Sequence, residues 1–131
     1  MKMLVVDDDF TCRTLLSEIL KSYGSADIAV NGKEAVEAVK AAMAASEPYE
    51  LICLDVMMPI MDGQEALAEI RAFEVAQGIS SSKGAKIVMT TSLGDAKNTI
   101  ESYKNLCDAY LVKPIDKAKL LEAIRKLKLI E

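Results

Sequence analysis

Charged side chains follow three apolar segments of this chain, each at the point where the segment ends. The three places are Asp55 after residues 51–54, Asp7, Asp8 and Asp9 after residues 4–6, and Lys113 after residues 109–112. Short runs of buried-type residues that end in a polar group and a loop are typical of central parallel strands. Because the carboxyl ends of parallel strands meet at one edge of an open sheet, we expect these groups to converge. Acidic groups beside an ammonium group suit a divalent cation and a phosphoryl group.

The clustered carboxylates need a compensating charge. Two ionised carboxylates about 4 Å apart repel each other by roughly 4 kcal/mol at an effective dielectric constant of about 20. The chain contains no histidine, and the nearby Cys53 lies inside a predicted strand, so a softer metal is disfavoured. Mg²⁺ prefers carboxylate oxygens and keeps several waters, which makes it the expected occupant beside Asp7 and Asp8. For Asp9 we favour the plainer role of capping the helix that follows.

Phosphate recognition must work here without a glycine-rich loop, because neither G-x-G-x-x-G nor a Walker A motif occurs. The aspartates would repel a bare phosphate, so a phosphoryl group needs a metal ion and a cationic side chain. Lys113, immediately before Pro114, can supply that cation, although a lysine at a strand end can also simply face solvent. Thr91 or Ser92, which end another apolar run, can donate to a phosphoryl oxygen or cap the next helix. Residue chemistry alone leaves these two roles open.

Strand and helix patterns alternate along the chain. Apolar runs predict strands at residues 2–6, 26–30, 50–54, 86–90 and 109–112. Apolar stripes at helical spacing predict helices around residues 15–20, 35–43, 67–73 and 120–127, with a weaker one at 95–105. This alternation predicts an α/β fold, a doubly wound (βα)5 sandwich around a five-stranded parallel sheet in the order 2-1-3-4-5. The first and third strands are then neighbours, and residues 1–131 are expected to form one domain.

Composition excludes several classes of function. The net charge of −4 argues against direct nucleic-acid binding, which needs a basic face. No apolar run approaches the roughly 20 residues that span a bilayer, and the first residues do not resemble a signal peptide, so membrane insertion is not expected. Three widely spaced cysteines without a C-x-x-C motif indicate reduced thiols. We therefore expect a cytoplasmic protein.

Four segments together resemble the response regulator receiver domain, and the resemblance covers essentially the whole chain. The segments are residues 5–8 (VVDD), 54–63 (LDVMMPIMDG), 90–92 (TTS) and 110–114 (YLVKP). Each motif alone is weak, but all four follow in the family's order and lie on the expected strands. The resemblance implies a flavodoxin-like fold and a role in two-component signal transduction.

The resemblance also implies a magnesium-dependent phosphoacceptor site. Asp55 would be the phosphoacceptor and a ligand of Mg²⁺, for which Mn²⁺ could substitute. The other ligands would be Asp8 directly, Asp7 through a water, and the backbone carbonyl of Met57. Lys113 would contact the phosphoryl group, and its peptide bond with Pro114 would be cis.

A conformational switch follows from the same resemblance. Asp55 would receive a phosphoryl group from the phosphohistidine of a histidine kinase or of a phosphotransfer protein. Thr91 would be the switch hydroxyl, and Tyr110 the aromatic residue whose rotamer follows it. The surface that changes would include Asn98, Ser102, Tyr103, Tyr110 and Lys119. The output protein is not identifiable, and we expect a monomer or weak dimer that acts as a signalling switch rather than an enzyme.

Two positions tune the lifetime of the phosphoryl group in this family, and here they are Met57 and Leu93. Both are apolar and cannot orient an attacking water, so slow self-dephosphorylation is expected.

Other functions on the same architecture remain as alternatives. The domain could relay its phosphoryl group to a further histidine protein. A magnesium-dependent phosphatase with an aspartate nucleophile, such as a haloacid-dehalogenase relative, would want a second aspartate where this chain has Met57. A flavin-binding electron carrier is opposed by the acidic loop after the first strand.

Overall fold

The computed structural model describes residues 1–80, 83–92 and 106–131. The strands are β1 (Lys2–Val6), β2 (Ser25–Ala29), β3 (Leu51–Asp55), β4 (Lys86–Thr91) and β5 (Ala109–Val112), and the helices are α1 (Phe10–Leu20), α2 (Gly32–Ala44), α3 (Gly63–Ala76) and α5 (Lys117–Lys126). Each strand begins and ends within one residue of its predicted bounds. The helix predicted at 95–105 lies outside the described residues, as do Leu93, Asn98, Ser102 and Tyr103. No helix in the described ranges has the length and apolar character needed to cross a bilayer.

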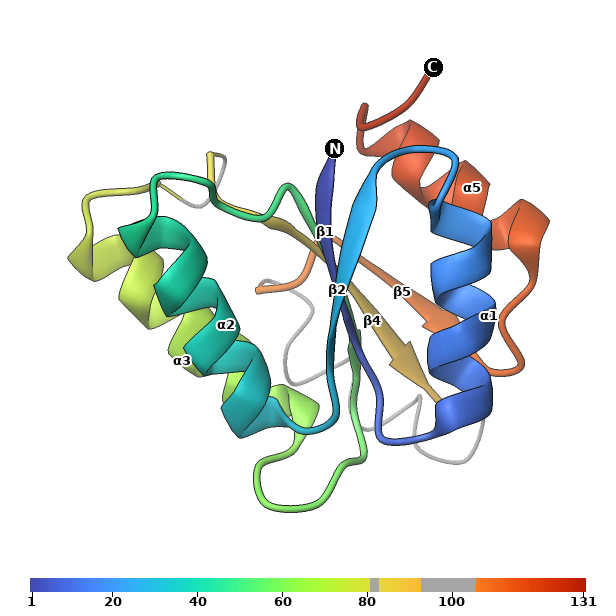
Figure 1. The fold of residues 1–131 in the computed structure, drawn as a ribbon, viewed down its shortest axis with the longest axis horizontal. Coiled ribbons are helices and arrows are strands. Elements are labelled where there is room, and N and C mark those ends of the chain that lie inside the picture. Colours follow the sequence, from blue (N-terminus) through green and yellow to red (C-terminus); the bar gives the residue numbers. More distant parts are fainter. Residues whose placement is uncertain (81–82, 93–105) are drawn as a thin grey trace.

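Within the described ranges the strands form one parallel sheet in the order β2-β1-β3-β4-β5, as predicted. Figure 1 shows α1 and α5 on one side of this sheet and α2 and α3 on the other. In β3, Ile52 and Leu54 pack in the cluster that contains residues of α2 and α3, whereas Leu51 and Cys53 pack with residues of α1 and α5. Burial on both faces explains why this strand is apolar throughout.

Side-chain caps fix where the helices begin. Asn31 Oδ1 accepts a hydrogen bond from the backbone N–H of Glu34 at 2.9 Å, and Glu34 Oε1 accepts one from the N–H of Val30 at 3.0 Å. Asp62 caps α3 and Asp116 caps α5 in the same manner, with their side chains accepting N–H bonds of the first turn. Such caps each contribute about 1 kcal/mol and set the loops that lead out of the strands.

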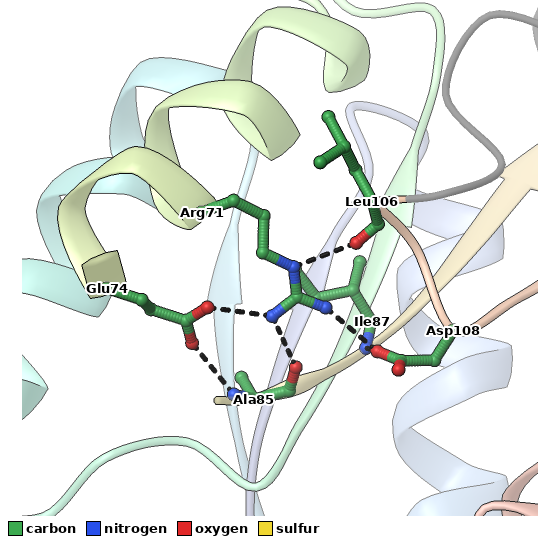
Figure 2. Close-up of polar contacts among 6 residues, drawn as sticks. All are labelled: Arg71, Glu74, Ala85, Ile87, Leu106 and Asp108. Atoms are coloured by element: carbon green, nitrogen blue, oxygen red, sulfur yellow. Dashed lines mark hydrogen bonds and ion pairs between the residues drawn. The ribbon is translucent and has the colours of Figure 1, made fainter. Parts of the chain in front are cut away.

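A buried arginine ties α3 to the segments that precede β4 and β5 (Figure 2). The guanidinium of Arg71 donates to the backbone carbonyls of Leu106 and Ala85, both at 2.8 Å. It also forms ion pairs with Glu74 at 2.8 Å and Asp108 at 2.9 Å. The second carboxylate oxygen of Glu74 accepts a hydrogen bond from the N–H of Ala85 at 2.8 Å. This cluster lies at the opposite end of β4 from Thr91.

Candidate functional site

The three aspartates expected to converge do so at the carboxyl ends of β1 and β3. One carboxylate oxygen from each of Asp7, Asp8 and Asp55 lies within 4.8 Å of the others. The sheet causes this convergence, because β1 and β3 are paired in register up to the residues just before Asp7 and Asp55. Asp7 is fully buried and Asp55 is 4% exposed, whereas Asp8 is exposed to solvent. This cluster, called the acidic pocket below, therefore combines two buried carboxylates with one that faces solvent.

Lys113 reaches the same pocket from the end of β5. Its Nζ lies 3.0 Å from Asp7 Oδ2 and 3.2 Å from Asp55 Oδ1, and its side chain is 23% exposed. Its backbone N–H donates to the carbonyl of Thr91 at 2.7 Å, which fixes it beside β4. The peptide bond between Lys113 and Pro114 is cis, as expected. When all four groups are ionised, three carboxylates and one ammonium leave two negative charges in the pocket.

The pKa values of the pocket reflect this imbalance. Burial, followed by the negative charge of Asp7, raises the pKa of Asp55 to about 6, although Lys113 opposes the shift. Burial alone would lower the pKa of Lys113, but its hydrogen bond to Asp7 and the charge of Asp55 outweigh this and raise it above its usual range. At neutral pH Asp55 is ionised against an electrostatic cost. A bound cation would remove that cost.

The donor set fits a hard divalent cation. All three side chains offer carboxylate oxygens, which Mg²⁺ prefers, and the exposure of Asp8 leaves room for the waters that Mg²⁺ retains. Asp7 already has partners for both oxygens, because Oδ1 accepts the N–H of Asp9 at 2.9 Å and Oδ2 faces Lys113. The side chain of Asp9 accepts from the N–H of Thr11 and caps α1, as favoured from the sequence.

The backbone around Met57 is fixed by two hydrogen bonds. The N–H of Val56 donates to the carbonyl of Thr90 at 3.0 Å, and the N–H of Gly63 donates to the carbonyl of Val56 at 2.8 Å. A Cβ at position 63 would clash with the carbonyl oxygen of Asp55, so only glycine permits this close approach. The start of α3 is thereby held directly against the loop that carries Met57.

Two threonine hydroxyls lie at the end of β4. Thr91 is buried, and its hydroxyl donates to the carbonyl of Ser92 at 3.3 Å. Thr90 is the register partner of Asp55, and its buried hydroxyl has no hydrogen-bond partner among the described residues. The sequence analysis considered the hydroxyls of Thr91 and Ser92 but not that of Thr90. Only the register between β3 and β4 places Thr90 opposite Asp55. Tyr110, on β5, is 48% exposed.

Comparison with known proteins gives one consistent result. The family model described as the response regulator receiver domain matches residues 3–125. The chemotaxis protein CheY of Halobacterium salinarum is 39% identical over 124 residues, which cover 94% of this chain and 92% of that protein. CheY of Treponema pallidum is 36% identical over 125 residues, covering 94% of this chain and 79% of that protein.

Solved structures agree with this result. A CheX–CheY–BeF3–Mg²⁺ complex from Borrelia burgdorferi has a chain that matches with a TM-score of 0.82 and 27% identity, covering 100% of this chain and 90% of that one. The receiver domain of the sensor histidine kinase PA1611 from Pseudomonas aeruginosa, with magnesium in its active-site cleft, matches with a TM-score of 0.75 and 25% identity. That match covers 96% of this chain and 95% of that domain.

Proposed function

Because the chain belongs to the response regulator receiver family, and is thus a receiver domain of two-component signalling, we propose that Asp55 is its phosphoacceptor. The donor is the phosphohistidine of a histidine kinase or of a phosphotransfer protein. The observation that carries this proposal is the position of Lys113 Nζ, which lies between the buried carboxylates of Asp7 and Asp55. A cation held there can accept the charge of an incoming phosphoryl group.

Asp55 acts as the nucleophile in this proposal. One of its carboxylate oxygens attacks phosphorus in line with the P–N bond of the donor, and that bond breaks with its electron pair left on the imidazole nitrogen. The attack requires the ionised carboxylate, which in the metal-free protein predominates above a pH of about 6. Lys113 keeps its contact with Asp7 and transfers its second contact from Asp55 to a phosphoryl oxygen.

The residues proposed to hold Mg²⁺, or Mn²⁺ in its place, are Asp8, Asp55 and the backbone carbonyl of Met57, with Asp7 acting through a water. When bound, the ion supplies positive charge against the phosphoryl oxygens. The exposed position of Asp8 leaves the pocket open to the donor, and the hydrogen bonds on either side of Met57 keep its carbonyl in place.

The response to phosphorylation is proposed to run through Thr91 and Tyr110. The Thr91 hydroxyl exchanges its contact with the Ser92 carbonyl for a phosphoryl oxygen, and the half-exposed ring of Tyr110 moves inward. The domain thereby works as a signalling switch toward an output protein, in the cytoplasm, as a monomer or weak dimer, and it turns over no external substrate. The apolar side chain of Met57 is expected to slow hydrolysis, so a Met57→Asn variant should lose its phosphoryl group faster.

Mass spectrometry after incubation with acetyl phosphate and Mg²⁺ tests the acceptor. We expect one phosphoryl adduct per chain, which is absent in Asp55→Asn and present in the matched variant Asp116→Asn, where asparagine still caps α5. An adduct that persists in Asp55→Asn would contradict the proposal. Continuous turnover of a phosphomonoester would instead identify a phosphatase.

A further inference from the structure

Thr90 lies beside Asp55 on one face of the sheet. The strand pairing places Thr90 between Asp55 on β3 and Leu111 on β5. Side chains alternate between the two faces along a strand. Cys53 and Val88, two residues earlier on β3 and β4, pack in the cluster of α1 and α5, and Leu111 packs against the same cluster. Asp55 and Thr90 therefore share this face, and their strands run about 4.8 Å apart.

The side chain of Lys113 crosses the end of β4 to reach its partners. Lys113 follows β5, but its ammonium group contacts Asp55 Oδ1 at the end of β3 and Asp7 Oδ2 after β1. Because β4 lies between β5 and β3, this side chain passes the strand end where Thr90 is only 1% exposed. The hydroxyl of Thr90 nevertheless has no hydrogen bond to any described residue. Lys113 thus occupies an oxygen of Asp55, and the hydroxyl next to that carboxylate is left without a partner.

A buried hydroxyl without a hydrogen bond destabilises the state that contains it. The phosphorylated state offers the hydroxyl of Thr90 a partner, because Lys113 then turns to a phosphoryl oxygen and releases Asp55 Oδ1. The other oxygen of Asp55 carries the phosphorus, so Oδ1 becomes the carbonyl oxygen of the acyl phosphate and can accept a hydrogen bond. An interaction that is made in only one of two states shifts the equilibrium toward that state. The hydroxyl of Thr90 would therefore favour the phosphorylated form.

We propose that Thr90 is a positioning residue for the phosphorylated acceptor, and that its hydroxyl donates to the oxygen of Asp55 that Lys113 releases. The inference rests on the proposed function of Asp55. It gives the two threonines at the end of β4 different acceptors, since Thr91 serves a phosphoryl oxygen and Thr90 serves the carboxyl oxygen. The side chain of a threonine has few χ1 rotamers, so one rotation about χ1 is enough to turn the hydroxyl toward the neighbouring strand.

Beryllofluoride, which binds a carboxylate oxygen as a stable mimic of a phosphoryl group, tests this inference by titration calorimetry in saturating Mg²⁺. We expect Thr90→Val to bind beryllofluoride about tenfold more weakly than the wild type, because the hydrogen bond to Asp55 is lost. Thr90→Ser keeps the hydroxyl and should bind it as tightly as the wild type. Mg²⁺ alone should bind Thr90→Val and the wild type equally, since Lys113 holds Asp55 until the phosphoryl mimic arrives.

Ser17→Ala is the matched control. The hydroxyl of Ser17 is also buried without a hydrogen bond to any described residue, and it lies on α1 about 12 Å along the helix from Asp9. Both Ser17→Ala and Thr90→Val should raise the free energy of unfolding of the free protein, but only Thr90→Val should weaken the binding of beryllofluoride.

Three results would overturn the inference. The first is equal binding of beryllofluoride by Thr90→Val and the wild type. The second is an equal loss of Mg²⁺ binding in Thr90→Val, which would assign the hydroxyl to the ion. The third is a free protein destabilised by Thr90→Val, which would show that the hydroxyl already has a partner. If beryllofluoride does not bind the wild type and acetyl phosphate does not label Asp55, the proposed function fails instead, so the two failures are distinguishable.

Discussion

Two polar clusters lie at opposite ends of the sheet, and they differ in how well their charges are matched. The Arg71 cluster pairs one guanidinium with the carboxylates of Glu74 and Asp108, and backbone groups take up the remaining hydrogen bonds, including the N–H of Ile87 at 2.7 Å from Asp108. Among the described residues, the acidic pocket sets three carboxylates against one ammonium group, that of Lys113.

This difference in charge matching indicates that the Arg71 cluster stabilises the fold, whereas the acidic pocket is suited to bind a cation. Buried charges are tolerated when every group has a partner, as around Arg71. The other end keeps an excess of negative charge, a raised pKa at Asp55 and a Thr90 hydroxyl that has no hydrogen-bond partner in the described part of the chain. A ligand that brings positive charge would find its partners already in place there. Removing a charged side chain should therefore lower the free energy of unfolding at the Arg71 end, and removing a carboxylate should raise it at the acidic pocket.

The largest effect is expected for Arg71→Met, which removes the cation that pairs with the buried carboxylate of Glu74 and the partly buried carboxylate of Asp108. We expect a loss of about 3–5 kcal/mol in the free energy of unfolding, measured by urea titration. Lys126→Met serves as the control, because its ion pair with Glu122 joins side chains that are 77% and 64% exposed. That change should cost less than about 0.5 kcal/mol. Equal losses in the two variants would contradict the structural role of Arg71.

Asp55→Asn should stabilise the metal-free protein. A pKa of about 6 in the folded state, against 3.8 as the ordinary value, means that the folded protein binds more protons than the unfolded one between these pH values. The wild type therefore loses stability as pH rises through this window, and the variant does not. We expect a gain of about 2–3 kcal/mol at pH 7.5 that disappears below about pH 4. Urea titrations at both pH values, with EDTA present, check this.

Magnesium should stabilise the protein by binding at the acidic pocket, and the Arg71 cluster should not affect this. At ten times its measured Kd, Mg²⁺ should raise the unfolding free energy of the wild type by about 1.4 kcal/mol. The gain should be similar in Arg71→Met and largely lost in Asp55→Asn. Calorimetry supplies the Kd, and sodium chloride at matched ionic strength is the control. A gain that survives intact in Asp55→Asn would place the ion elsewhere.

The smallest change is expected for Thr90→Val, which puts a methyl group of the same shape in place of a buried hydroxyl that no described residue hydrogen-bonds. Removing that hydroxyl should raise the free energy of unfolding by about 1 kcal/mol. Thr91→Val removes a hydroxyl that donates a hydrogen bond, so it should give no such gain. Parallel denaturation curves of the two variants decide between these outcomes.

Sequence patterns predicted the sheet and the acidic pocket because both depend on strand order. Apolar runs located the strands, and parallel pairing brought Asp7, Asp55 and Lys113 to one edge. The Arg71 cluster could not be predicted in this way, since a polar position on a helix usually faces solvent. Two of its partners are backbone carbonyls that carry no sequence signal.

The loop between β3 and α3 turns at Ile60, where φ is +69°, and the sequence could not predict this turn for a related reason. A left-handed residue is normally marked by glycine or asparagine, and the sequence Pro59-Ile60-Met61 contains neither. The contacts at this turn are between backbone groups, because the N–H of Gly32 donates to the carbonyl of Met61 and the N–H of Met61 donates to the carbonyl of Pro59. Local composition therefore gave no indication of the left-handed backbone at Ile60.

The Arg71 cluster also fixes the end of β5 that is remote from Lys113. Asp108, immediately before this strand, is fixed through Arg71 and the N–H of Ile87, whereas Lys113, immediately after it, contacts Asp55. The strand has four residues and is about 13 Å long. A displacement of about 1 Å at Lys113 thus needs a rotation of only about 4° about a fixed base. We expect a phosphoryl group on Asp55, as proposed, to shift Lys113 and so to tilt β5, with Tyr110 on it, about this fixed end.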